Sequence, residues 1–127
     1  MTEEDYIQEL RDRWPKECET SLETIARADE AVQAFSQSSR LWVMRGNLIE
    51  LGPESCRHSL EDALASYQRA IEITPEFTEA WEEVGRYYDA VLDDEATAER
   101  YFREAARLRG AAYNAVERMG LRCRRLF

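Results

Sequence analysis

The 127-residue sequence has few residues that break helices or build catalytic centres, with 3 prolines, 5 glycines and a single histidine. Its 3 cysteines are an odd number without Cys-x-x-Cys spacing, which argues against a disulfide framework and a zinc site. No apolar run approaches the roughly 18 residues that span a bilayer, and the acidic residues 3–5 are unlike the basic start of a signal peptide. We therefore expect a cytoplasmic protein without a membrane segment, metal or cofactor.

Negative charge is abundant and unevenly distributed. Residues 1–106 carry 25 acidic and 11 basic side chains, whereas residues 107–127 carry six arginines and one glutamate. A nucleic-acid-binding domain normally presents a basic face to the phosphates. The acidic body therefore argues against DNA or RNA as a ligand and favours a basic partner.

Apolar residues recur with helical period along most of the chain, and Ala, Glu, Arg and Leu dominate, so we expect an all-α fold. The breaks at Pro, Gly and polar clusters predict about seven helices, and the short connections predict that successive helices are antiparallel. The first three span 2–14, 16–35 and the stretch from the Ser36–Ser39 turn to Leu51, and the fourth ends near Ile73. The fifth spans 79–92, the sixth is capped by Asp93 and Asp94 and closed by Gly110, and the seventh spans 112–126. The start of the fourth helix stays open. The capping box Ser59–Asp62 gives one start, and the helical phase that begins just after Pro53 gives another.

The helix pairs recur at a nearly fixed spacing. Ala63, Tyr67 and Ala70 recur 35 residues later as Ala98, Phe102 and Ala105, and Trp42 and Gly46 precede Trp81 and Gly85 by 39 residues. We assign the four-residue difference to a longer turn over residues 52–59. Such pairs predict hairpins in which Gly85 allows close backbone approach, while Val84, Tyr88 and Val91 face inward.

At these positions the chain resembles the tetratricopeptide repeat family, whose signature is Trp-x-x-Leu-Gly-x-x-Tyr, then Ala-x-x-x-Phe, and later Pro. Trp81, Val84, Gly85 and Tyr88, followed by Ala98 and Phe102, match it closely, whereas Arg45 stands where an apolar residue is usual. The resemblance implies a right-handed α-solenoid of antiparallel hairpins that forms a single domain over residues 1–127. Its parts would be a degenerate first hairpin (1–38), a repeat with an extended turn (39–76), a second repeat (77–110) and a capping helix (111–127).

The resemblance also implies a peptide groove lined by the first helix of each hairpin. The positions that it places in the groove are Arg40, Asn47, Glu79, Glu82, Glu83, Arg86, Asp89, Asn114 and Arg118. The family's carboxylate clamp is not expected here, because Glu83 would repel such a ligand. The predicted function is a non-catalytic protein–protein interaction scaffold that binds a basic peptide or protein segment in an acidic concave groove. The same acids could instead be solvated and paired with Arg86.

Two other functions compete with this one. In the first, the basic C-terminal helix docks on the acidic body of another copy, which would make the protein a self-associating homo-oligomer. In the second, Cys56 and His58 form a catalytic pair. Both residues lie in the extended turn, where a solvated loop is the simpler expectation, so we do not expect an enzyme.

Overall fold

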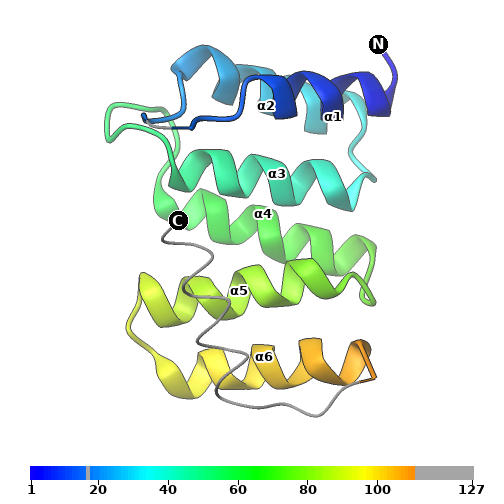
Figure 1. Ribbon diagram of the computed structural model, residues 1–127, viewed down its shortest axis with the longest axis vertical. Coiled ribbons are helices and arrows are strands. Elements are labelled where there is room, and N and C mark those ends of the chain that lie inside the picture. Colours follow the sequence, from blue (N-terminus) through cyan, green and yellow to red (C-terminus); the bar gives the residue numbers. More distant parts are fainter. Residues whose placement is uncertain (17, 111–127) are drawn as a thin grey trace. The chain divides into compact units, whose positions relative to one another are not determined.

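The structure is a computed structural model, and it describes residues 1–16 and 18–110. In this part of the chain all the regular secondary structure is helical (Figure 1), which confirms the all-α prediction. The helices are α1 (Glu3–Asp12), α2 (Leu22–Ala34), α3 (Ser39–Glu50), α4 (Leu60–Ile73), α5 (Thr78–Ala90) and α6 (Glu95–Leu108). The seventh predicted helix, 112–126, lies outside the described residues. No described helix has both the length and the apolar character needed to cross a membrane.

Polar caps set most of the helix starts. The Ser21 side chain accepts a hydrogen bond from the Thr24 amide, and the Asp94 side chain accepts one from the Thr97 amide, both at 3.1 Å. The Ser59 amide donates to the Asp62 carboxylate at 2.9 Å, so α4 begins at the capping box and the earlier alternative is wrong.

The predicted start of the second helix near residue 16 is also wrong, since α2 begins at Leu22. The Thr20 amide donates to the carbonyl of Leu51 at 2.9 Å, at the end of α3. Because the Thr20 amide is bonded to Leu51, it does not take part in a helix. Ser21 is the N-cap, and α2 starts at the next residue.

Contacts divide the chain into two compact units, Met1–Thr74 and Pro75–Phe127. The first unit holds α1 to α4, and its consecutive helices run antiparallel, as predicted (Figure 1). A core of fully or nearly fully buried side chains joins α1, α2 and α3. Its members are Tyr6, Ile7, Leu10, Ala28, Ala31, Val32, Leu41 and Leu48. The single-domain organisation over 1–127 stays a prediction.

The second unit holds the antiparallel pair α5 and α6 (Figure 1). Ala98 and Phe102 of α6 are buried, and Tyr88 of α5 packs against them. Val84 is fully buried, as predicted. Val91, predicted to face inward, is 38% exposed and is the C-cap residue that follows the last residue of α5.

The hairpins α3–α4 and α5–α6 share two local contacts. A Cβ atom placed on Gly46 would lie 2.4 Å from the Tyr67 ring, and one placed on Gly85 would lie 2.9 Å from the Phe102 ring. In addition, the indoles of Trp42 and Trp81 each donate to a carbonyl six residues earlier, at 2.9 and 2.8 Å. The close approach predicted at Gly85 is therefore confirmed, and the periodic residues make corresponding contacts in both hairpins.

Candidate functional site

Two of the residues predicted to line a groove lie on α3 in the first unit. Arg40 is at the surface, with its guanidinium 3.3 Å from the carboxylate of Glu4. Asn47 accepts a hydrogen bond from the Tyr67 hydroxyl at 2.9 Å. Asn47 therefore ties α3 to α4, whereas Arg40 stays available at the surface.

The acidic residues predicted for the groove lie on α5 and differ in their surroundings. Glu79 is exposed, whereas Glu82 accepts a hydrogen bond from Arg109. Glu83 forms an ion pair with Arg86, and the two side chains are only 8% and 11% exposed.

Asp89, at the end of the same helix, is 3% exposed. Part of the negative charge on α5 is thus compensated or buried, and Glu79 is the acid that α5 presents to solvent. Asn114 and Arg118 lie outside the described residues.

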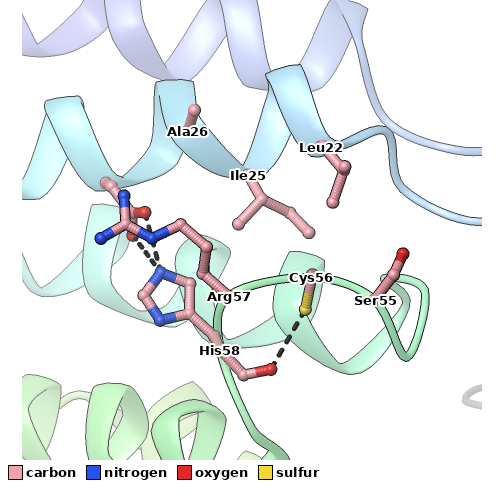
Figure 2. Close-up of a pocket in the computed structure, with 8 residues that line it drawn as sticks. Leu22, Ile25, Ala26, Ser55, Cys56, Arg57 and His58 are labelled. Carbon is pink, nitrogen blue, oxygen red and sulfur yellow. Dashed lines mark hydrogen bonds and ion pairs between the residues drawn. The ribbon is translucent and has the colours of Figure 1, made fainter.

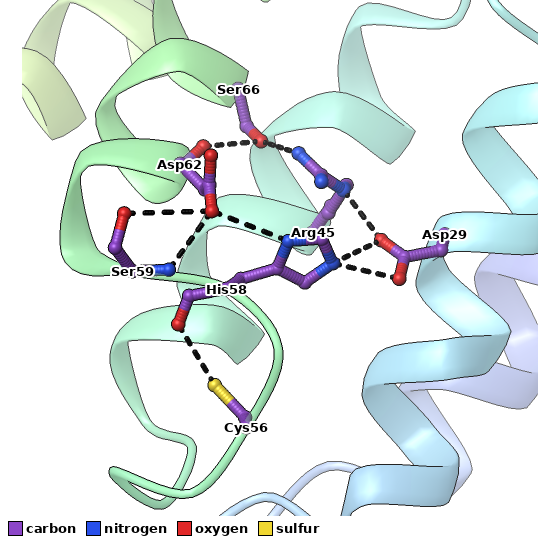
Figure 3. Close-up of polar contacts among 7 residues, drawn as sticks. All are labelled: Asp29, Arg45, Cys56, His58, Ser59, Asp62 and Ser66. Carbon is purple, nitrogen blue, oxygen red and sulfur yellow. Dashed lines mark hydrogen bonds and ion pairs between the residues drawn. The ribbon is translucent and has the colours of Figure 1, made fainter.

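The first unit also contains a polar cluster that no sequence pattern predicted. Arg45 of α3 donates from Nε to Asp29 of α2 at 2.8 Å and from Nη1 to the Ser66 hydroxyl of α4 at 2.5 Å (Figure 3). The Arg45 side chain is 14% exposed. One guanidinium therefore joins three helices, and we call Asp29, Arg45, His58, Asp62 and Ser66 the Arg45 cluster.

His58 brings the extended loop into the Arg45 cluster. Its Nε2 atom lies 2.8 and 3.0 Å from the two carboxylate oxygens of Asp29, and its Nδ1 atom lies 3.4 Å from Asp62 (Figure 3). The His58 side chain is 18% exposed, so the expectation that it lies in a solvated turn is wrong. The Ser59 amide lowers the pKa of Asp62, and His58 and Arg45 act in the same direction against the effect of burial.

Cys56 does not approach the imidazole of His58 as a catalytic pair would require. Its thiol donates to the backbone carbonyl of His58 at 3.1 Å (Figure 3), while both imidazole nitrogens face carboxylates. These contacts hold the loop in place and direct the imidazole of His58 to carboxylates instead of to the thiol. No group of described His, Cys, Asp and Glu residues is arranged to hold a metal ion.

The extended loop and α2 enclose a pocket with a volume of about 160 Å³ (Figure 2). Gly52 fits against α2 because a Cβ atom there would lie 2.7 Å from Cδ1 of Ile25. The pocket is lined by Leu22, Ile25, Ala26 and Asp29 of α2 and by Ser55, Cys56, Arg57 and His58 of the loop. The loop that lengthens this hairpin therefore forms one wall of the pocket.

Comparison with known proteins adds no assignment. No family model matches the chain, and no curated protein matches it.

Proposed function

We propose that the protein is a non-catalytic interaction scaffold of the tetratricopeptide-repeat type, which binds a basic peptide or protein segment in an acidic groove on the first helices of its hairpins. The observation that carries the proposal is the pair of contacts shared by α3–α4 and α5–α6. In each hairpin an aromatic ring sits against a glycine and a tryptophan indole caps a carbonyl. Similar hairpins at a regular spacing are the building blocks of extended binding surfaces.

Charge supports a basic ligand. Residues 1–74 carry 15 acidic and 8 basic side chains, and residues 75–110 carry 10 acidic and 5 basic ones. A negative surface steers cationic segments toward it and disfavours anionic ones. Cys18 and Cys56 have free thiols, which agrees with the cytoplasmic setting that belongs to this proposal.

Binding of fluorescent ten-residue peptides to the full chain, followed by anisotropy, tests the proposal. We expect an Arg- and Lys-containing peptide to bind more tightly than a Glu-containing peptide with the same apolar residues. Added salt should weaken this binding because exposed charges are screened. The variant Glu79→Lys should weaken it further, since Glu79 is the exposed acid of α5.

Glu99→Lys is the matched control. Glu99 lies on α6, the second helix of the same hairpin, and its side chain is 43% exposed. This variant makes the same change in net charge on the other helix, so it should weaken binding less than Glu79→Lys. Equal effects of the two variants would mean that only net charge matters, and tighter binding of the acidic peptide would refute the proposal.

A further inference from the structure

The pocket between α2 and the loop has no role in the proposed scaffold function, and its shape and charge point to a ligand of a different kind. Leu22, Ile25 and Ala26 give it an apolar wall on the α2 side (Figure 2). Its volume of about 160 Å³ is close to that of engineered apolar cavities of about 150 Å³ that bind benzene. A single six-membered ring or a short branched chain therefore fits.

The charges around the pocket favour an anionic head group. The Asp29 carboxylate, which lines the pocket, is already in contact with Arg45 and His58. The exposed acids of α2 also have partners, because Glu23 lies 3.8 Å from Arg13 and Glu30 contacts Arg27.

Arg57, in contrast, lines the pocket with an exposed side chain and makes no hydrogen bond or ion pair to any described residue. Ser55 adds an exposed hydroxyl to the same lining. The charge left uncompensated at the pocket is thus the guanidinium of Arg57.

We propose that this pocket binds a small monocarboxylate with a compact apolar tail. The tail lies against Leu22, Ile25 and Ala26, and the carboxylate pairs with Arg57, whose planar guanidinium matches a carboxylate in geometry. Cys56 also lines the pocket, so a bound ligand lies beside this residue. This inference goes beyond the scaffold function and does not depend on it.

Titration of the full ¹⁵N-labelled chain with three probes tests the proposal. Benzoate, benzyl alcohol and benzylamine present a similar ring with a negative, a neutral and a positive head. We expect benzoate to shift the amide resonances of α2 and of residues 55–58, and to bind about fivefold more tightly than benzyl alcohol. Benzylamine should bind most weakly.

Two substitutions, each with a control, test the carboxylate contact with Arg57 and the apolar wall on α2 separately. Arg57→Gln should remove the preference for benzoate, whereas Arg11→Gln, on an exposed arginine of α1, should preserve it. Ala26→Leu should fill the pocket and prevent the binding of all three probes. Ala34→Leu, on an exposed alanine at the other end of α2, should have no effect.

Protection of the thiols gives an independent measurement. Benzoate should slow the alkylation of Cys56 by iodoacetamide and leave the rate at the exposed Cys18 unchanged. Equal affinities for the three probes, an unchanged preference in Arg57→Gln, or shifts confined to other helices would each overturn the proposal.

Discussion

Arg45 departs from the repeat pattern, and its contacts explain why a charged residue is stable there. An apolar side chain at this position would pack between helices, whereas the guanidinium of Arg45 bonds both Asp29 on α2 and Ser66 on α4. The bond to Asp29 also helps to orient the carboxylate that holds His58. Groups in such a cluster depend on one another, because removing one partner leaves another charge partly buried without compensation.

Arg45→Met should therefore lower the free energy of unfolding by about 2 kcal/mol, less than for a fully buried pair because Asp29 is 25% exposed. Arg40→Met is the control on the same helix. Arg40 is 46% exposed, and among the described residues its ion pair is with the exposed carboxylate of Glu4, so its loss should cost about 0.5 kcal/mol or less. Urea unfolding followed by circular dichroism measures both values.

A double-mutant cycle tests whether the effect comes from the Asp29 contact. If it does, Arg45→Met combined with Asp29→Asn should cost clearly less than the sum of the two single changes. Additive costs would show that Arg45 contributes independently of Asp29, through packing or through its bond to Ser66.

For single residues, the sequence showed that Arg45 stands where an apolar residue is usual, but it did not show which residues Arg45 contacts. Asp29 lies 16 residues before Arg45, and His58 lies 29 residues after Asp29. Whether such residues meet depends on how three helices and a loop are placed, and no local pattern encodes that. The pairing of Glu83 with Arg86 was easier to predict, because residues three apart on a helix are neighbours. The sequence had offered this pairing as an alternative to a binding role for the acids.

At the scale of the helices, small residues set how closely α3 approaches α4 and α5 approaches α6. Tyr67 is fully buried, and its hydroxyl is held by Asn47 and Glu50, so its ring cannot move away from Gly46. The Phe102 ring has no hydroxyl to hold it in this way, and a Cβ atom on Gly85 would overlap it less, at 2.9 Å against 2.4 Å for Gly46 and Tyr67.

Alanine substitutions at these two glycines should therefore be destabilising, although alanine favours a helix over glycine by about 1 kcal/mol. We expect a loss of about 2 kcal/mol for Gly46→Ala and about 1 kcal/mol for Gly85→Ala, because the added Cβ atoms would overlap the rings. Thermal unfolding of the two variants provides the comparison. A rise in stability for either one would show that the hairpin is more loosely packed than described.

The caps make the helices sensitive to acid. The pKa of Asp62 is lowered chiefly by the Ser59 amide, and that of Asp94 chiefly by the Thr97 side chain. A carboxylate whose pKa is lower in the folded state stabilises the fold above its ordinary value of about 4, and this contribution disappears as pH falls through the folded-state value.

The melting temperature of Asp62→Asn should accordingly lie below that of the unmodified protein at pH 7, and the difference should shrink below about pH 4. Melting curves from pH 7 to pH 3 measure it. A difference that stays constant over this range would mean that the charge of Asp62 contributes nothing to the cap.

The helical spacing of apolar residues predicted which segments form helices, but it did not fix where α2 and α4 begin. The chain before Ser21 keeps residues compatible with a helix, but the bond from Thr20 to Leu51 and the Ser21 cap place the start at Leu22. For α4, local sequence offered two starts of similar quality, and the loop contacts of His58 accompany the later one. A long-range bond therefore accompanies the start of α2, whereas the local capping box of Ser59 and Asp62 marks the start of α4.

On the scale of the whole chain, the described cysteines and the interior of each unit point to a fold held by packing. Cys18 and Cys56 are free thiols, and the buried clusters of the two units are built from aliphatic and aromatic side chains. We predict that reductant leaves the far-ultraviolet circular dichroism spectrum and the melting temperature unchanged. A fall of several degrees on reduction would reveal a disulfide that contributes to stability.

The proposal that the first helices of the hairpins bind a basic segment is tested most directly by mapping where a basic peptide binds. Amide resonances of the full ¹⁵N-labelled chain, recorded with increasing amounts of an Arg- and Lys-containing peptide, report the contact surface. We predict that the changes centre on α3 and α5, including Arg40 and Glu79, and are smaller on α4 and α6. Changes centred on α4 and α6, or no saturable change, would contradict the account.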